Sequence, residues 1–222
     1  GTGGTGTMLN AGDAITSTQT IFVYAETGTT PNCSAENSFV VTINNTPTAD
    51  VIADVTACDS FILPALTVGD YYTGTGGTGT VLNAGDAITT TQTIFIYAET
   101  GTVPNCTDES SFVVTINTTP TVDAPANVTE CVSYTLPALV NGTYYTAAGG
   151  TGTVLNAGDV ISSTQTIYVY AETGTTPNCI DENSFVVTIN PLPNVVDPSP
   201  LIVCDDNVAD GMTEMDLTTK NN

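Results

Sequence analysis

The sequence predicts an all-β protein, a tandem array of small immunoglobulin-like β-sandwich domains. A 14-residue segment recurs as PNCSAENSFVVTIN at 31–44, PNCTDESSFVVTIN at 104–117 and PNCIDENSFVVTIN at 177–190, which sets a period of 73 residues. Apolar and polar residues alternate within each period, as they do in half-buried strands. Turn signals rich in Gly, Asn and Thr separate these runs, and none of the runs has helical spacing.

The period divides the chain into four predicted parts. Residues 1–44 are the C-terminal part of one repeat, residues 45–117 and 118–190 are complete repeats, and residues 191–222 start a further, divergent repeat. A proline stands at the same place in each connecting segment, as Pro47, Pro120 and Pro193. Roughly six or seven short strands in a repeat of this length are typical of a small immunoglobulin-like sandwich.

The alternation in the strand before the cysteine predicts which of its faces is buried. In the strand before the cysteine, aliphatic positions alternate with positions that hold Phe in one copy and Tyr in another, such as Phe22 and Tyr168. A position that accepts a phenol hydroxyl lies at a wet boundary, so we expect the aliphatic positions to face the core. In the second copy the expected core residues of this strand are Ile94, Ile96 and Ala98, and in the last strand Phe112, Val114 and Ile116 share one face.

Charge excludes two classes of partner. The chain has 23 Asp and Glu residues, a single Lys or Arg and no His, for a formal net charge of −22. Nucleic acid and anionic lipid headgroups are bound through Lys and Arg, so neither is expected as a partner. The sequence also lacks an apolar run of the roughly 18–20 residues that a membrane span needs, so direct membrane insertion is not expected.

The residue inventory argues against an enzyme. General acid–base catalysis most often uses His, which is absent, and the only cationic side chain, Lys220, stands near the end of the sequence. Paired carboxylates such as Asp86, Glu99 and Glu109 recur in every copy, and three identical active sites in tandem would be unusual. We therefore predict no catalytic residue and no cofactor beyond the calcium considered below.

The six cysteines predict disulfide bonds. They stand at 33, 58, 106, 131, 179 and 204, with gaps of 25 and 48 residues in alternation. Pairing across the longer gap gives Cys58–Cys106 and Cys131–Cys179, each closing one domain, with Cys33 and Cys204 paired outside the fragment. A domain of this size has a small core and needs a cross-link. This scheme is favoured, because pairing across the shorter gap would disrupt the head-to-tail array that the repeat implies.

Pairing across the shorter gap is the alternative. It would use all six cysteines, but each closing strand and the next opening segment would have to fold back as a hairpin around Pro47 or Pro120. Either scheme places the chain outside the reducing cytosol. A zinc site is not expected, because the sequence has neither a CxxC pair nor a His.

The repeating pattern resembles a known family. The pattern is C-x-S-x-x-LPAL, G-x-YY, GGTGT-x-LNAGD-x-I, TQTI-x-x-YAETGT-x-PNC and SFVVTIN, and it covers residues 1–190. It is similar to the repeats of the giant surface adhesins of gliding Bacteroidetes, which the type IX secretion system exports. The segment VCDDNVADGMTEMDLTT at 203–219 resembles a second repeat type of the same adhesins.

The resemblance implies a function and a location. The repeats would form the stalk or filament of a secreted adhesin on the cell surface, attached to the outer membrane. They would extend a distal binding region for surface attachment and gliding motility. Neighbouring repeats of the same chain are then the expected partners, and the motility machinery and the external substratum would be contacted through other regions.

Two sets of residues support an alternative, in which the repeats themselves bind glycan or protein ligands and calcium stiffens them. The paired tyrosines Tyr71–Tyr72 and Tyr144–Tyr145 are the candidate platform, but strand alternation predicts that each pair splits, with one ring in the core. The best calcium candidate is a partial acidic loop with Gly211 at its turn. Its expected ligands are Asp205, Asp206, Asn207, Asp210 and Asp216.

A second calcium candidate is the recurring set Asp86, Glu99 and Glu109. For both sets the favoured interpretation is that the acids are solvated surface groups, whose like charge keeps neighbouring filaments apart.

Overall fold

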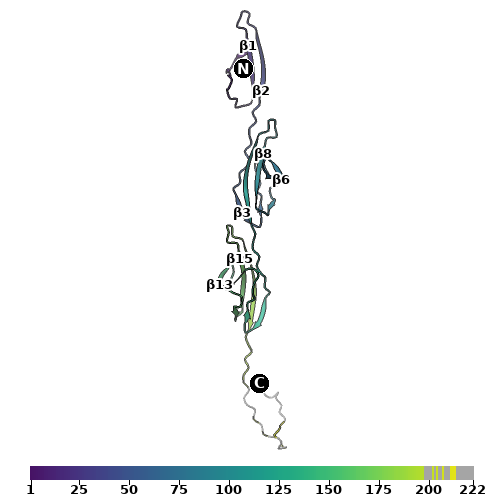
Figure 1. The fold of residues 1–222 in the computed structure, drawn as a ribbon, viewed down its shortest axis with the longest axis vertical. Coiled ribbons are helices and arrows are strands. Elements are labelled where there is room, and N and C mark those ends of the chain that lie inside the picture. Colours follow the sequence, from purple (N-terminus) through teal and green to yellow (C-terminus); the bar gives the residue numbers. More distant parts are fainter. Residues whose placement is uncertain (198–201, 203, 205–206, 208–210, 214–222) are drawn as a thin grey trace. The chain divides into compact units, whose positions relative to one another are not determined.

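The computed structural model describes residues 1–197, 202, 204, 207 and 211–213. Among these residues one short 3-10 helix, η1 (Thr2–Gly4), accompanies sixteen strands, so the predicted all-β class is confirmed (Figure 1). The described residues contain no helix that is long and apolar enough to cross a membrane.

The second copy of the repeat forms a seven-stranded sandwich. Five strands make one sheet in the order β3-β9-β8-β5-β6, and two short strands make the other, β4-β7. Apolar side chains from both sheets fill the space between them, as expected of an immunoglobulin-like fold. The strands are β3 (Val55–Cys58), β4 (Phe61–Ile62), β5 (Asp70–Gly74), β6 (Thr78–Leu82), β7 (Ala87–Ile88), β8 (Gln92–Glu99) and β9 (Thr107–Asn117).

The first strand of this sandwich runs parallel to the last. Strand β3 pairs with the C-terminal part of β9, from Val55 opposite Val114 to Cys58 opposite Asn117. The other neighbour of β9 is β8, which pairs with it antiparallel. The parallel pairing places Cys58 at the end of the sandwich where the chain leaves β9.

The third copy repeats this arrangement. Its sheets have the orders β10-β16-β15-β12-β13 and β11-β14, and β10 is parallel to β16, with Cys131 opposite Asn190. The strands are β10 (Val128–Cys131), β11 (Tyr134–Thr135), β12 (Thr143–Ala147), β13 (Thr151–Leu155), β14 (Val160–Ile161), β15 (Gln165–Glu172) and β16 (Ile180–Asn190).

The predicted core face is confirmed. The expected residues of β8 are buried, with Ile94 and Ile96 each 0% exposed. On β9, Phe112 and Val114 are buried against them, and Ile116 packs on the same cluster. The rings of Phe95 and Tyr97, on the other face of β8, are partly exposed. The same aliphatic face is buried in β15 and β16, where Ile167, Val169 and Val187 are 0% exposed.

The first copy contains a single hairpin, β1 (Gln19–Glu26) with β2 (Ser34–Val41). Residues 1–44 match only residues 74–117 of the second copy, so the strand that would correspond to β3 is not among them. Phe39 is 54% exposed here, whereas its counterpart Phe112 is 1% exposed. The apolar face of a copy is therefore covered only when the opening strands are present.

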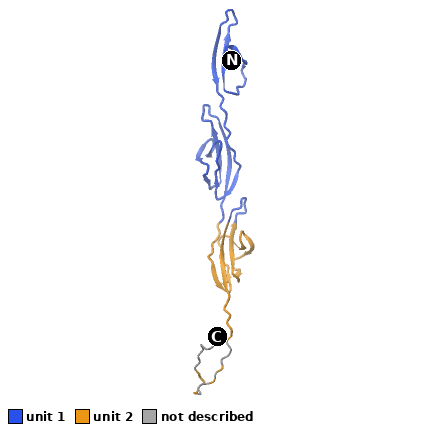
Figure 2. Cartoon of the chain, turned by 180° about the vertical axis from the view of Figure 1, so that it is seen from behind, with its two compact units in different colours: residues 1–120, 172–180 blue, residues 121–171, 181–222 orange. Residues whose placement is uncertain are grey.

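The chain divides into two compact units, coloured separately in Figure 2. One consists of residues 1–120 together with residues 172–180, and the other of residues 121–171 and 181–222. The segment 172–180 thus belongs to the third copy in sequence but to the first unit in structure. The predicted domain boundaries, after residues 44, 117 and 190, remain predictions.

Candidate functional site

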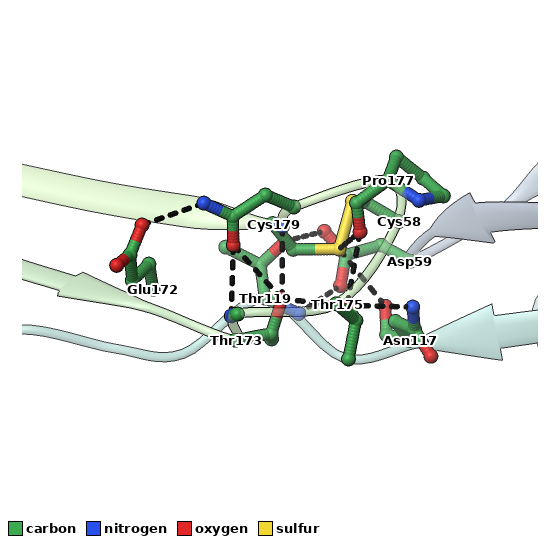
Figure 3. The surroundings of a disulfide bond; sticks show 11 residues. Cys58, Asp59, Asn117, Thr119, Glu172, Thr173, Thr175, Pro177 and Cys179 are labelled. Atoms are coloured by element: carbon green, nitrogen blue, oxygen red, sulfur yellow. Dashed lines mark hydrogen bonds between the residues drawn. A yellow bond between two sulfur atoms is a disulfide. The ribbon is translucent and has the colours of Figure 1, made fainter.

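A disulfide bond between two successive copies is the main chemical feature of the chain. Cys58, the last residue of β3, is bonded to Cys179, which stands immediately before β16 (Figure 3). The two Cα atoms are 5.7 Å apart, although 121 residues separate the cysteines in sequence. Cys179 is 1% exposed.

The loop that presents Cys179 is held by its own hydrogen bonds. The backbone N–H of Thr173 donates to the carbonyl of Cys179 at 3.0 Å, and the N–H of Cys179 donates back to the Thr173 hydroxyl at 3.0 Å. Asn178 donates from its amide to Glu172 at 2.6 Å and accepts from the N–H of Gly174 at 2.9 Å. The cysteine is thereby fixed in place by its own hairpin.

The segment after Cys58 turns sharply beside the end of β9. Asp59 adopts φ 61°, and its N–H donates to the carbonyl of Asn117 at 2.9 Å. The carboxylate of Asp59 accepts from the hydroxyl of Thr119 at 2.6 Å and from the N–H of Thr119 at 2.8 Å. These two hydrogen bonds lower the pKa of Asp59, and the bond from the Thr119 hydroxyl has the larger effect.

Further contacts join the loop to the end of the second copy. The amide of Asn117 donates to the hydroxyl of Thr175 at 3.0 Å, and the sulfur of Cys179 lies 3.9 Å from the carbonyl oxygen of Asn117 (Figure 3). The exit of β9, the turn at Asp59 and the loop 173–179 therefore form one site, which we call the joint.

The structure corrects the predicted pairing. Because Cys58 is bonded to Cys179, the predicted bonds Cys58–Cys106 and Cys131–Cys179 are both wrong in this structure. Cys58 lies beside Asn117 at the end of β9, whereas Cys106 precedes Thr107 at its start. At roughly 3.3 Å per residue, an 11-residue strand separates these positions by on the order of 30 Å, far beyond the roughly 7 Å limit between bonded Cα atoms.

The alternative pairing across 25 residues is not formed either. Cys33, Cys106, Cys131 and Cys204 are free thiols in the described part of the chain. A separation of 121 residues is the sum of gaps of 48, 25 and 48, so it agrees with the repeat as well as 25 or 48 does. Among the six cysteines, only Cys58 and Cys179 are 121 residues apart. The spacing alone could therefore not select the correct pair. The predicted partners of Cys33 and Cys204 outside the fragment remain predictions.

The acids that recur in every copy stabilise turns. Asp86 accepts from the N–H of Asn83 at 2.7 Å, and Glu99 accepts from the amide of Asn105 at 2.8 Å. Glu109 accepts from the N–H of Gly76 at 2.5 Å. Each acid has a separate partner, and the described residues contain no group of three or more His, Cys, Asp or Glu placed to hold a metal ion.

The other calcium candidate is untested. Asp205, Asp206, Asp210 and Asp216 lie outside the described residues, and Asn207 is exposed. A calcium site in this segment stays a prediction.

The tyrosine pairs split as predicted. Tyr71 and Tyr144 are each 2% exposed, while Tyr72 and Tyr145 are partly exposed and pack edge-on against Tyr97 and Tyr170. The hydroxyl of Tyr71 donates to the carbonyl of Pro64 at 3.1 Å. The hydroxyl of Tyr144 has no hydrogen-bond partner among the described residues.

Comparisons with known proteins establish no family. No protein-family model and no curated protein matches the chain. Solved cadherin structures match at low similarity. Protocadherin gamma C5 domains EC1-3 match with a TM-score of 0.35 and 11% identity, over 78% of each chain.

Two further cadherin structures match at the same level. Protocadherin gamma B2 domains 3-6 match with a TM-score of 0.29 and 12% identity, over 78% of this chain and 59% of that one. Mouse cadherin-23 EC22-24 matches with a TM-score of 0.27 and 13% identity, over 80% and 76%. This chain thus spans about three fifths of the protocadherin gamma B2 structure. TM-scores at this level carry no argument, so the fold rests on the strand pairing and the cores described above.

Proposed function

We propose that the repeats form the stalk or filament of a secreted cell-surface adhesin. In this role they transmit force between the cell, where the protein is attached to the outer membrane, and a distal region that binds the substratum. The similarity of residues 1–190 to the repeats of gliding adhesins exported by type IX secretion supports the more specific role in gliding motility. Neighbouring repeats are then the main partners of each copy.

The single observation that supports this proposal best is the Cys58–Cys179 bond. A peptide linker alone joins successive domains in most multidomain chains. Here a covalent bond joins successive copies a second time, so a pulling force has a path that bypasses the linker. A disulfide also needs an oxidising environment, which agrees with a position outside the cell.

The alternative, that each copy binds a glycan or protein ligand, receives less support. One ring of each tyrosine pair is buried, so the paired platform does not exist. The hollows beside Tyr72 and beside Tyr71 have volumes of 150 and 220 Å³, smaller than the roughly 300–1,000 Å³ of ordinary ligand sites. The recurring acids already accept hydrogen bonds from within their own copy.

Competition separates the two functions. Purified, oxidised chain 1–222 is added to cells that attach through the full protein, and the attached fraction is measured. A stalk has no affinity for the substratum, so we expect no change even at a large excess of the chain. A dose-dependent loss of attachment would show that the repeats themselves bind the ligand. Antibodies against residues 45–190 test the location, because they should label intact cells.

A further inference from the structure

We propose that Cys106 and Cys131 form the same kind of bond as Cys58 and Cys179, each with a further copy of this repeat. Cys131 stands one period after Cys58, and Cys106 stands one period before Cys179. The bond observed between their counterparts shows what the two positions do when both halves of a joint are present. The first cysteine of every copy would then be bonded to the second cysteine of the next copy.

Cys106 already lies in one half of a joint. Its N–H donates to the hydroxyl of Thr100 at 3.0 Å, as that of Cys179 does to Thr173. Its sulfur lies 3.6 Å from the carbonyl oxygen of Asn44, where Asn44 occupies the place of Asn117. The amide of Asn44 donates to the hydroxyl of Thr102 at 2.9 Å, which matches the bond from Asn117 to Thr175. The missing part is the counterpart of Cys58, which residues 1–44 do not include.

Cys131 lies in the other half. It pairs with Asn190 at the end of β16, as Cys58 pairs with Asn117 at the end of β9. The N–H of the next residue, Val132, donates to the carbonyl of Asn190 at 3.0 Å, and Val132 adopts φ 68°, close to the 61° of Asp59. The thiol of Cys131 is exposed. It is therefore presented at the exit of the third copy, where the loop of a following copy would arrive.

The chemistry is an ordinary thiol–disulfide exchange. Two thiols lose two protons and two electrons as the S–S bond forms, and a small-molecule or protein disulfide accepts them and is reduced to two thiols. Glutathione disulfide supplies this oxidant in vitro.

Such a ladder limits how far the chain can be stretched. A fully unfolded copy of 73 residues spans up to about 250 Å at roughly 3.5 Å per residue. With every bond in place, the shortest covalent path from Cys58 to Cys204 crosses the disulfide to Cys179 and then follows only 25 residues of chain. This path covers two copies, and it repeats along the array. The limit falls to roughly 45 Å per copy, about a five-fold reduction. Unfolding under load then releases little length.

The test extends the chain by one copy. Residues 118–190 are duplicated directly after Asn190, both chains are oxidised with glutathione disulfide, and free thiols are alkylated. A protease that cleaves at acidic residues then separates all the cysteines, because Asp or Glu stands between each successive pair. The 222-residue chain should give only Cys58–Cys179 and four alkylated thiols. The extended chain should add a bond from Cys131 to the inserted counterpart of Cys179, with four thiols again.

Other results would overturn the proposal. An alkylated Cys131 in the extended chain, or Cys131 bonded to Cys179 or Cys106, contradicts it directly. A covalent dimer on a non-reducing gel would show that a second chain, and not the next copy, supplies the partner. The matched control is Cys131→Ser in the extended chain. This variant should keep Cys58–Cys179 and leave the inserted counterpart of Cys179 as a free thiol. These outcomes concern only the joint, so they are independent of the competition test of the adhesin role.

Discussion

Cys58 lies beside Asn117, at the end of the long strand β9, because β3 and β9 run parallel. This one register decides what the cysteine can reach. The chain leaves β9 at the same point and enters the third copy, whose loop 173–179 supplies Cys179. A cysteine at the opposite end of β3 would face the other end of its own sandwich.

The first prediction concerns the stability that this bond provides. Closing a loop of 121 residues stabilises the folded state by about 5 kcal/mol in the chain-entropy model. We expect Cys58→Ser, Cys179→Ser and the double variant to lower the thermal midpoint by the same amount, because all three remove one bond. Scanning calorimetry under oxidising conditions measures this. A double variant that is clearly less stable than both single variants would mean that the two cysteines do not act as a pair. Cys131→Ser is the control and should leave the thermal midpoint unchanged.

The second prediction compares two tyrosines in equivalent positions. The buried hydroxyl of Tyr71 has an acceptor in Pro64, and that of Tyr144 has none among the described residues. Tyr71→Phe should therefore reduce the free energy of unfolding by about 1 kcal/mol, whereas Tyr144→Phe should be neutral or stabilising. Urea titration of both variants against the parent checks this. Equal losses in the two variants would show that the hydroxyls have equivalent partners in solution.

Much of the sandwich could be predicted from the sequence, because burial follows strand alternation. The period-2 pattern placed Ile94 and Ile96 in the core and split Tyr71 from Tyr72, since neighbouring side chains in a strand point to opposite faces. The sequence pattern of a strand does not show whether its partner strand runs parallel or antiparallel. A short strand such as Val55–Cys58 shows the same pattern whether it pairs parallel or antiparallel, so the end of the sandwich at which Cys58 lies was not predictable from alternation.

The joint was missed for a related reason. The spacing between cysteines is the same in every copy. It therefore cannot show whether a cysteine is bonded within its own copy or to the equivalent cysteine of the next copy. The turn at Asp59 was equally hidden, because a positive φ at Asp or Val has no strong sequence signal of the kind that Gly gives.

The third prediction concerns pH. Hydrogen bonds from Thr119 lower the pKa of Asp59 in the folded protein. A lowered pKa means that the contact stabilises the fold above the carboxyl's unfolded pKa, and that this contribution is lost as the pH falls through the folded pKa. Thr119→Val should return the pKa of Asp59 toward its ordinary value, as followed by NMR titration of the carboxyl carbon. The backbone N–H at position 119 is kept in this variant, so an unchanged titration curve would exclude the Thr119 hydroxyl as a cause.

The last prediction concerns the recurring acids and calcium. Glu109 accepts a hydrogen bond from the N–H of Gly76, and Glu182 does the same for Gly149 one copy later. Glu109→Ala should lower the free energy of unfolding by a few tenths of a kcal/mol to about 1 kcal/mol, since the turn loses its acceptor while water solvates the freed N–H. Because the carboxylate is already used within the copy, the loss should be the same in excess calcium and in EDTA.

The matched control is Asp70→Ala in the same copy. The exposed side chain of Asp70 makes no hydrogen bond among the described residues, so its removal should change stability little in either buffer. Thermal unfolding of the parent and both variants, with and without calcium, gives the comparison. If Glu109 held calcium, the ion would stabilise the parent and not Glu109→Ala. A calcium-dependent gap between those two chains, absent for Asp70→Ala, would therefore contradict the structural role assigned to Glu109.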